Sequence, residues 1–370
     1  MISRLRRVAV AIAASMCVLG AGPGVALAAS WSAQTPAVPP GSSSALFESV
    51  SCPTTSFCAA VGFSHSSTAV VPLAERWDGA TWTIDDTPVA PGASQNILFG
   101  VSCATANACL AVGESTVGDV TQEGAATSLW AERWDGSAWT VETPATPPLS
   151  SHSSLRGVSC ASATDCTAVG YYWSNDVELP LAEHWAGSRW TLEQVPSADL
   201  SELYGVACSS ATVCTAVGNA NVGYRGIAGV WTEQPGPGPD APAGGLNGVS
   251  CPSPDACTAV GWYENTSNHA LFAPSPGAER WNGINWTEQP TGDDRIGPML
   301  RSVSCPTTSL CLAGGEGTVQ RWRPSSGWTF ETVPVSGFWY GISCPKQNVC
   351  TAAGVEYTSG STVPAVLRYS

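Results

Sequence analysis

The stretch GVSCASATDCTAVG, residues 157–170, decides the fold, because the 370-residue chain contains seven close copies of it. Each copy places two cysteines six positions apart, with a short apolar run on either side. The first cysteines of the copies are at positions 52, 103, 160, 208, 251, 305 and 344. Their spacing varies from 39 to 57 residues, which indicates an array of similar structural units with loops of different length.

Each repeat contains four short β-rich runs. In residues 155–196, LRGVSCASATDCTAVG is followed by a loop and then by LAEHWAGSRWTLEQVP. The first strand ends at V-S-C, the second runs through C-x-A-V-G, the third through L-A-E-x-W, and the fourth begins at W-T. In the fourth repeat, which lacks the W-D-G turn, the third strand is predicted near Val222–Arg225. The pattern predicts an all-β fold, a seven-bladed β-propeller of four-stranded blades.

The seventh repeat is split between the two ends of the chain. It stops at AVLRYS, residues 365–370, before any fourth strand. The missing piece resembles SWSAQTPAVPP, residues 30–40, which matches TWTIDDTPVAP of the first repeat. We therefore expect Trp31–Pro36 to pair with Val366–Tyr369 and to close the last blade, which removes two exposed sheet edges. An array of two-layer β-sandwiches is the alternative, but it leaves the split repeat unexplained.

The N-terminal segment is typical of a secretory signal peptide. Residues 1–28 have a basic start, an apolar stretch and the small-residue site Ala26-Leu27-Ala28. A lipoprotein anchor at Cys17 is the alternative, but Met16 stands where a small residue is needed. The apolar stretch is too short to span a membrane. The prediction is a signal peptide over residues 1–28 and one propeller domain over residues 29–370.

Cysteine usage predicts disulfides. Apart from Cys17, fourteen cysteines form seven C-x5-C pairs, and this even count at constant spacing is typical of disulfides in an exported chain. Zinc is the alternative, but its cysteines usually come as C-x2-C or C-x4-C with histidines nearby, and the four histidines hold no repeated position. The predicted pairs are Cys52/Cys58, Cys103/Cys109, Cys160/Cys166, Cys208/Cys214, Cys251/Cys257, Cys305/Cys311 and Cys344/Cys350.

The composition limits the possible partners. The chain has 15 basic and 29 acidic residues, a net charge of −14, and a single lysine, Lys346. So acidic a surface repels phosphate backbones and anionic membranes, which argues against nucleic acid and against membrane insertion. Solubility outside the cell explains the charge. We expect a secreted, extracellular protein that is a monomer.

The phrase L-x-G-V-S-C-x-S-x-x-x-C-x-A-V-G followed by W-x-G-x-x-W resembles the β-propeller repeats of exported bacterial proteins. The resemblance covers Trp31–Ser370 and implies the fold; those proteins mostly have no assigned activity. The turn WDGATW is also distantly similar to the Asp-box, S-x-D-x-G-x-x-W, of sialidase-like propellers, although Asp78 is one residue too close to Gly79. The Asp-box is a structural turn, so this likeness implies no sialidase chemistry.

Residues that recur in every repeat serve the scaffold, whereas residues that break the pattern are free to serve function. Alternation sends the third-strand glutamates and arginines to opposite faces, and we interpret them as structural partners between blades. They are Glu75, Glu132, Glu183 and Glu279 with Arg76, Arg133, Arg280 and Arg321. The repeated tryptophans, such as Trp77 and Trp82, are interpreted as packing between blades.

Two sets of residues break the pattern. Three positions before the first cysteine every repeat has Gly or Ser, but one position earlier the repeats disagree completely. That position holds Glu48, Phe99, Arg156, Tyr204, Asn247, Arg301 and Tyr340. Two loops also open with aromatic residues, namely Tyr171, Tyr172 and Trp173, and Trp262 and Tyr263. We predict that these residues bind a ligand at the mouth of the central channel; the alternatives are a channel filled with solvent and rings that pack against their own loops.

No catalytic or metal motif is present. G-x-S-x-G and D-x-D-x-D-G are absent, so we expect no metal and no cofactor. The sequence favours a binding module over an enzyme: a secreted propeller that recognises a glycan or surface ligand through its variable face. Two alternatives stay open, a polysaccharide-active enzyme (glycoside hydrolase or lyase) at the channel mouth and an extracellular protein-interaction scaffold. The expected partner is a glycan or an extracellular protein.

Overall fold

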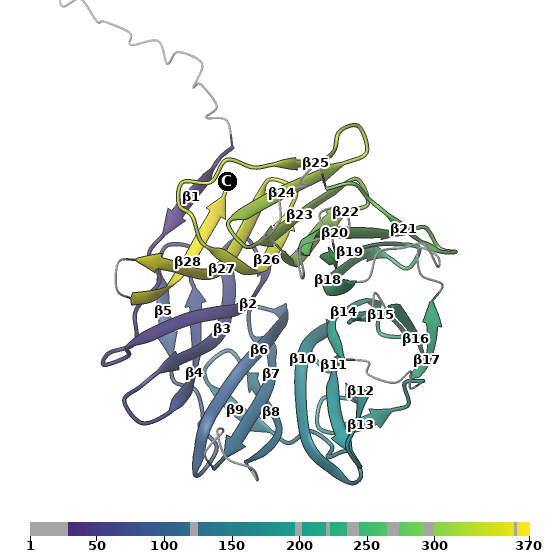
Figure 1. Cartoon of the computed structure of the whole chain (residues 1–370). Coiled ribbons are helices and arrows are strands. Elements are labelled where there is room, and N and C mark those ends of the chain that lie inside the picture. The colour runs from purple at the N-terminus through teal and green to yellow at the C-terminus, as the bar shows by residue number, and fades with distance from the viewer. Residues whose placement is uncertain are drawn as a thin grey trace, which may run out of the picture.

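The computed structural model describes residues 29–118, 125–196, 202–219, 223–234, 244–264, 274–291, 299–358 and 361–370. The predicted signal peptide, residues 1–28, lies outside them. Within these ranges the regular structure consists of β-strands and includes no helix, which confirms the all-β prediction. No apolar helix long enough to cross a membrane is found there. Figure 1 shows the strands gathered in sheets around a central axis.

The strands follow one another in the order that the repeats predict. The first half of the chain contains β1 (Trp31–Gln34), β2 (Ser44–Thr54), β3 (Phe57–His65), β4 (Val70–Trp77), β5 (Trp82–Asp85), β6 (Ala93–Thr105), β7 (Ala108–Val117), β8 (Ala126–Trp134), β9 (Trp139–Glu142), β10 (Ser150–Ser162), β11 (Asp165–Ser174), β12 (Val177–Trp185) and β13 (Trp190–Glu193). The second half contains β14 (Leu203–Ser210), β15 (Val213–Gly218), β16 (Gly223–Ile227), β17 (Val230–Gln234), β18 (Gly244–Ser253), β19 (Ala256–Glu264), β20 (Pro274–Trp281), β21 (Trp286–Glu288), β22 (Leu300–Thr307), β23 (Leu310–Gly315), β24 (Thr318–Arg323), β25 (Gly327–Phe330), β26 (Phe338–Lys346), β27 (Val349–Thr358) and β28 (Ser361–Tyr369). The predicted third strand of the fourth repeat corresponds to β16, which extends two residues beyond Arg225; its predicted start, Val222, lies outside the described residues.

The strands pair in antiparallel sets of four, and each set is one sequence repeat. The set β14 to β17, for example, forms its own sheet in chain order. The sets β2 to β5, β6 to β9 and β10 to β13 are connected into a 12-stranded sheet by single parallel bridges, Val70 to Gln95 and Thr127 to His152. The last set combines β26, β27 and β28 with β1 from the other end of the chain.

The innermost strands of neighbouring repeats approach so closely that only small residues fit between them. These residues are the Gly or Ser three positions before each first cysteine. A Cβ on Gly157 would lie 2.8 Å from the carbonyl oxygen of Tyr204, and a Cβ on Gly341 would lie 2.7 Å from the Val50 nitrogen. Both distances are shorter than side-chain carbons tolerate, so the packing around the axis dictates the small residues.

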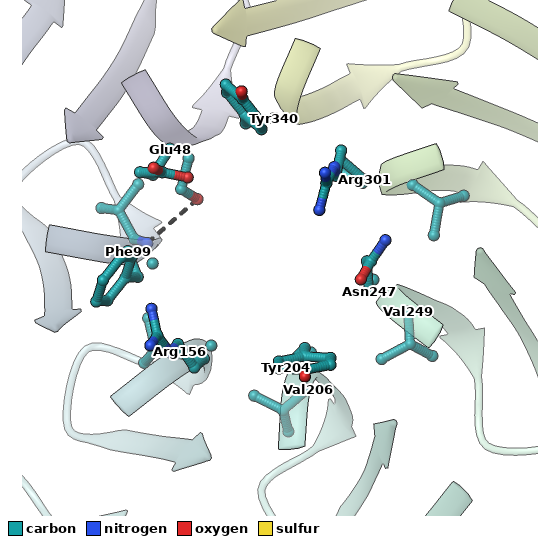
Figure 2. A pocket seen from close by; sticks show the side chains of 18 of the residues that line it. Glu48, Phe99, Arg156, Tyr204, Val206, Asn247, Val249, Arg301 and Tyr340 are labelled. Atoms are coloured by element: carbon teal, nitrogen blue, oxygen red, sulfur yellow. Dashed lines mark hydrogen bonds between the residues drawn. The ribbon is translucent and has the colours of Figure 1, made fainter. Parts of the chain in front are cut away.

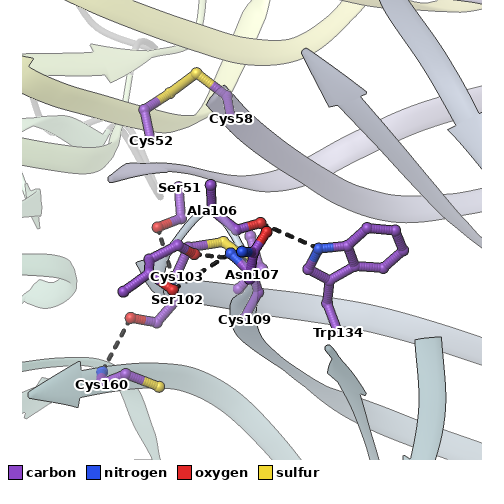
Figure 3. Close-up of a disulfide and its surroundings, with 12 residues drawn as sticks. Ser51, Cys52, Cys58, Ser102, Cys103, Ala106, Asn107, Cys109, Trp134 and Cys160 are labelled. Carbon is purple, nitrogen blue, oxygen red and sulfur yellow. Dashed lines mark hydrogen bonds between the residues drawn. A yellow bond between two sulfur atoms is a disulfide. The ribbon is translucent and has the colours of Figure 1, made fainter. Parts of the chain in front are cut away.

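At six of the seven junctions a hydrogen bond between neighbouring repeats connects these strands. The serine of V-S-C accepts, through Oγ, the backbone N–H of the first cysteine of the following repeat. Figure 3 shows this bond from Cys160 to Ser102, with a length of 2.9 Å. Equivalent bonds run from Cys103 to Ser51, from Cys208 to Ser159, from Cys305 to Ser250 and from Cys344 to Ser304. A final bond, from Cys52 to Ser343, connects the seventh repeat back to the first.

One junction lacks this bond. The fourth repeat reads V-A-C, so Ala207 stands where a serine would accept the N–H of Cys251. Ala207 and Cys251 both pack against the same core cluster, so the two strands still lie close together there. The junction between the fourth and fifth repeats is therefore packed but has no acceptor from this position.

The repeated arginines contact aromatic rings of the following repeat, which confirms their structural role. The guanidinium of Arg76 lies 4.7 Å from the ring centre of Trp134. The same contact is made by Arg280 and Trp322, by Arg321 and Tyr369, and by Arg368 and Trp77. The tryptophans also pair within a repeat, with 5.8 Å between the ring centres of Trp77 and Trp82. Their packing is thus partly within and partly between repeats, whereas the sequence predicted only the second.

The predicted disulfides are confirmed: seven are found among the described residues, one in each repeat between its first two strands. Each closes a hairpin of only five intervening residues, so the expected gain in chain entropy is about 2 kcal/mol for each bond. Disulfides of this kind are typical of proteins that fold in an oxidising compartment.

The second cysteine of each pair is buried in the core. In four repeats its sulfur contacts a threonine hydroxyl of the preceding repeat. The distances are 3.6 Å from Cys58 to Thr351, 3.5 Å from Cys214 to Thr167, 3.7 Å from Cys257 to Thr215 and 3.4 Å from Cys311 to Thr258. The sulfur atoms therefore also pack between repeats, a role that the sequence did not predict. Their burial assigns these predicted disulfide residues to the scaffold and excludes them from contact with a ligand. The buried set is Cys58, Cys109, Cys166, Cys214, Cys257, Cys311 and Cys350.

The W-x-G-x-x-W segment forms a tight turn between the third and fourth strands. Asp78 accepts the backbone N–H groups of Ala80 and Thr81 through Oδ1, at 2.8 Å each. Gly79 has a φ of +102°, which a residue with a side chain rarely adopts. The turn thus has a local structural explanation in its aspartate and glycine.

The N-terminal strand completes the last sheet. Trp31 lies opposite Tyr369 and Gln34 opposite Val366, which confirms the predicted pairing. The Trp31 side chain is only 6% exposed, and its indole N–H donates to Glu331 Oε2 at 3.1 Å. Figure 1 shows the purple β1 beside the yellow β28. Two distant ends of the chain therefore share one sheet.

We predict that Ala207→Ser stabilises the protein by about 1 kcal/mol, because the new hydroxyl accepts the N–H of Cys251. Ser102→Ala should destabilise it by a similar amount, since the Cys160 N–H then loses its acceptor. Urea denaturation of both variants measures the free energies of unfolding. If Ser102→Ala leaves the free energy of unfolding unchanged, the bond does not hold the strands together.

Deleting residues 29–40 should lower Tm by more than about 5 °C and promote association. The deletion exposes the edge of β28 and removes the buried Trp31 ring. Differential scanning calorimetry and light scattering measure the two effects. The single variant Gln34→Ala, which keeps the strand, serves as the control and should behave like the wild type. An unchanged Tm for the deletion would contradict closure by β1.

Candidate functional site

The seven variable residues that precede the axial glycines and serines line one cavity. It has a volume of about 600 Å³ and lies at the centre of the ring of innermost strands. Figure 2 shows Glu48, Phe99, Arg156, Tyr204, Asn247, Arg301 and Tyr340 around it. Each comes from a different innermost strand and sits one residue before the close backbone contact. The side chains at these positions face the central cavity and not a neighbouring strand, so they can be large.

Arg156 is held in place by aromatic rings. Its guanidinium carbon lies 3.9 Å from the ring centre of Phe99, and Nη2 donates to the Tyr171 hydroxyl at 2.9 Å. The carboxylate of Glu114 lies 3.8 Å from the same Nη2 and balances the charge. Burial alone would lower the pKa of Arg156, but Glu114 and Tyr171 oppose it and the pKa is raised. Arg156 is therefore a fixed cation with its edge toward the cavity.

Arg301 faces the cavity from the other side. It forms an ion pair with Glu316, which lies between β23 and β24, and it lies 5.9 Å from the ring centre of Tyr340. Asn247 is fixed beside it, because its Nδ2 donates to the carbonyl of Leu300 at 2.8 Å. Both cavity arginines thus have a carboxylate partner, so the mouth has much less excess positive charge than the two arginines alone suggest.

Among the described residues that line the cavity, Glu48 is the one with an acidic side chain. Burial raises the pKa of its carboxyl to about 7, although the charges of Arg156 and Arg301 oppose the shift. Among the described residues it has no hydrogen-bond partner. A carboxyl that is about half protonated near neutral pH can both donate and accept a hydrogen bond.

Beside the cavity, Tyr204 connects to a pair of carboxyl groups. Its hydroxyl donates to Glu202, which also interacts with the buried Glu178. Burial, followed by the charge of Glu202, raises the pKa of Glu178 to about 7. Burial also raises the pKa of Tyr204, and the bond to Glu202 adds to the shift. Tyr204 is therefore a hydrogen-bonding group and not an anion at neutral pH.

The predicted aromatic residues separate into different environments. Trp262 lines the cavity, and Tyr171 lies behind Arg156, where it stacks on His152. Trp173 lies in a different hollow, with His152 and Ser151. Tyr171 and Trp173 are two residues apart on β11, so they share a face and both lie near His152, with Trp173 farther from the axis.

Two of the predicted aromatic residues belong to the scaffold. Tyr263 is only 5% exposed, and its hydroxyl donates to Glu279 Oε1 at 3.1 Å, so the prediction that it faces a ligand is wrong. The physical reason is its position next to Trp262: one of two consecutive strand residues must point into the sheet interface. Tyr172 is half-buried and packs against the core cluster of the third repeat, which leaves it little role in binding.

Sequence reasoning missed the acidic partners Glu114, Glu202 and Glu316. Glu114 and Glu316 follow the glycine that ends C-x-A-V-G or its variant, the same position that holds Tyr171 and Trp262. This position also varies among the repeats, so the comparison used for the first strand, applied to the second, would have found them. Glu202 precedes Tyr204 by two residues and so lies on the same face of the chain.

The repeated glutamates have raised pKa values without belonging to the cavity. Burial raises the pKa of Glu75 and Glu279 to about 7 and that of Glu132 and Glu183 to about 8. Glu75 accepts the N–H of Ala37, and Glu183 accepts that of Ala145. Both donors lie in segments that follow the fourth strand of the preceding repeat. Their contacts support the interpretation that these carboxyls connect neighbouring sheets.

No group of three or more His, Cys, Asp or Glu side chains in the described ranges is placed to hold a metal ion. Burial is the main cause of the raised pKa values of carboxyl groups such as Glu48, Glu132 and Glu178. At the cavity, the arrangement offers two fixed guanidinium groups, an amide, one titrating carboxyl and several aromatic rings. These groups suit hydrogen bonding and stacking with a polar ligand.

Comparisons with known proteins show the fold. No family model matches the chain, and no curated protein matches it in sequence. Among solved structures it is similar to YCF48 bound to a D1 peptide, at 13% identity over 92% of this chain and 94% of that one, with a TM-score of 0.57. It is also similar to the WD40 β-propeller domain of Doa1 (14%, 92% and 97%, TM-score 0.55) and to Chaetomium thermophilum Sqt1 bound to the N-terminus of ribosomal protein L10 (10%, 89% and 97%, TM-score 0.50). These similarities show a β-propeller fold.

We predict that the protein becomes less stable as pH rises from 5.5 to 8.5. A carboxyl with a raised pKa binds more protons in the folded state than in the unfolded state between about pH 4.5 and its folded pKa, so the free energy of unfolding falls with pH across that range. Calorimetry of Glu132→Gln, which stays neutral, should show a weaker decline than the wild type. The exposed Glu233→Gln variant is the control. If Glu132→Gln and Glu233→Gln decline equally, Glu132 does not titrate as described.

Proposed function

We propose that the protein is an exported binding module that recognises a polar glycan at the mouth of its central channel. After removal of a signal peptide at residues 1–28, residues 29–370 form a propeller of seven four-stranded blades, with β1 as the fourth strand of the last. The protein acts outside the cell as a monomer. Support comes from the strand pairing of the repeats, the disulfides and the cavity at the axis.

One observation carries the proposal: the seven equivalent positions that line the cavity mouth hold five different residue types, while the next position is always Gly or Ser. Packing that repeats around an axis selects the same residue each time. A position that faces a cavity is not constrained by this packing, so its residue can be selected for binding a ligand. The variation is therefore best explained by recognition.

The chemistry of the cavity favours a saccharide. Tyr204, Tyr340 and Trp262 offer rings on which the apolar face of a sugar stacks, and Asn247 and Glu48 offer hydrogen bonds to its hydroxyl groups. Glu114 and Glu316 partly neutralise the cavity arginines, which favours a neutral or weakly anionic sugar over a strongly anionic one. The volume of about 600 Å³ lies within the range of small-ligand pockets, roughly 300–1,000 Å³.

Binding without turnover is proposed because Glu48 is the acidic residue that lines the cavity in the described ranges. Most enzymes that hydrolyse glycosides place two carboxyl groups around the bond to be cleaved. Glu178 and Glu202 interact directly with each other beside the cavity, which leaves no room for a glycosidic bond between them. A glycoside hydrolase or lyase is therefore the less favoured function.

A peptide is the competing ligand. Two similar propeller structures are of YCF48 bound to a D1 peptide and of Sqt1 bound to the N-terminus of ribosomal protein L10. The same stacking and hydrogen-bonding groups would accept peptide side chains. A screen on glycan arrays and on peptide arrays separates the two ligand classes.

We expect the mature protein to bind a defined set of glycans on an array, without releasing sugar. Replacing Arg156 and Arg301 together by Ala should weaken this binding at least about tenfold, because each guanidinium loses its hydrogen bonds to the ligand. The double variant Arg189→Ala and Arg323→Ala has the same change in charge at exposed positions and should bind normally. Circular dichroism checks the fold. Full affinity in the cavity variant contradicts the proposal, and so does binding to peptides alone.

A further inference from the structure

The junction between the third and fourth repeats lacks both members of the arginine–aromatic contact. The residue opposite the second cysteine is aromatic in the other repeats, as in the pairs Cys166–Trp185 and Cys350–Tyr369. In the fourth repeat Gly226 lies opposite Cys214. The residue that would contact this aromatic ring from the third repeat is also changed: His184 stands where the other repeats have arginine. Both changes fall on the same contact.

A carboxylate at this junction has consequently lost its usual partner. Where the fourth strand carries an acid three residues after its tryptophan, the third strand provides an arginine. The ion pairs are Arg76–Asp85, Arg133–Glu142 and Arg321–Glu331, at 2.7–3.0 Å. Glu193 has the same register as these acids, opposite Ala182. Since His184 replaces the arginine, Glu193 is the acid of this set without a guanidinium.

The hydrogen bond between this acid and a tryptophan of the next repeat is kept. Glu193 Oε2 accepts the indole N–H of Trp231 at 2.7 Å, just as Glu331 accepts that of Trp31 while it also binds Arg321. His184 is too short to replace the arginine, and its Nε2 lies 3.5 Å from Asp165 Oδ2 instead. No hydrogen bond to Glu193 Oε1 is found in the described part of the chain.

The missing side chains leave a cavity. It has a volume of about 200 Å³ and is lined by Asp165, His184, Glu193, Gly226 and Trp231, among others. Gly226 is required here, because the Trp231 ring lies against it and a Cβ would come within 2.9 Å of that ring. The cavity opens beside the turns at residues 211–212 and 228–229, whereas the channel mouth lies at the other end of the innermost strands.

We propose that this cavity binds the guanidinium group of an arginine side chain from a partner protein. Such a group pairs with Glu193 and so restores the guanidinium–carboxylate pair that three other repeats build internally, and it lies beside the Trp231 ring and Asp165. A guanidinium fits better than an ammonium group, because its planar fork matches a carboxylate and also stacks on an aromatic ring. The net charge of −14 attracts cationic partners to the surface. The site goes beyond glycan binding and does not depend on it.

The test uses the whole mature protein and a capped Gly-Arg-Gly peptide. Binding is followed through the NMR signal of the Trp231 indole N–H, which donates to Glu193 and is assigned with Trp231→Phe. We expect a saturable shift with Gly-Arg-Gly, at least tenfold weaker binding of Gly-Lys-Gly, and no saturable shift with Gly-citrulline-Gly, which has the shape without the charge. Equal binding of the citrulline peptide, or no saturable shift with arginine, overturns the proposal.

Three variants locate the site. His184→Arg places a guanidinium of the chain itself in the cavity, so it should abolish peptide binding and raise Tm. Glu193→Gln should weaken binding at least tenfold and keeps the test decisive if His184→Arg folds poorly. Glu142→Gln removes the equivalent acid at a junction that has its own arginine, and it should leave peptide binding unchanged. Unchanged binding in Glu193→Gln, or loss of binding in Glu142→Gln, contradicts the assignment.

Discussion

The close approach of the innermost strands around the axis is the constraint on which the rest of the structure depends. At six junctions, such as those of Cys160 with Ser102 and of Cys52 with Ser343, a first cysteine's N–H donates to a serine hydroxyl of the preceding repeat. At the seventh, Ala207 replaces the serine and packing keeps the strands close. At this distance a side chain at Gly157 would collide with the neighbouring backbone. The strands therefore admit only Gly or Ser at one position and leave the preceding one free to line a channel.

The same constraint distinguishes scaffold from site. Arginines over aromatic rings and buried glutamates recur because each junction between sheets presents the same geometry. Where the residue at an equivalent position differs between repeats, packing between the sheets does not determine it. The channel mouth has five residue types at its seven equivalent positions, whereas the junction between the third and fourth repeats departs from the arginine–aromatic pattern at His184 and Gly226. Two sites at opposite ends of the strands are thus recognised by one physical criterion.

Much of this could be predicted from the sequence, because the repeat is local and its period is short. Strand order and the disulfide pairs followed from the spacing of the repeats, and the pairing of β1 with β28 from the likeness of residues 30–40 to residues 81–91. The cavity ring followed from comparing one position among the repeats. The predicted orientation of Tyr263 was wrong, because a cluster of aromatic residues in the sequence does not reveal which face of the sheet each side chain occupies. The missing arginine partner of Glu193 was not predicted, because recognising it needs the register of β12 and β13, where Glu193 lies opposite Ala182, two residues before His184.

The carboxyl groups illustrate a second limit. Glu48 and Glu132 both have a raised pKa, yet one faces the cavity and the other lies between sheets. A raised pKa alone therefore does not distinguish a carboxyl group that can bind a ligand from a structural one; the location of the group in the fold is needed. A crystal structure of the mature protein with the glycan that it binds best tests the central claim most directly. Binding at the axis predicts density for the sugar within hydrogen-bonding distance of Arg156 and Arg301. Density found only on the outer loops, with the axial cavity filled by water, would contradict it.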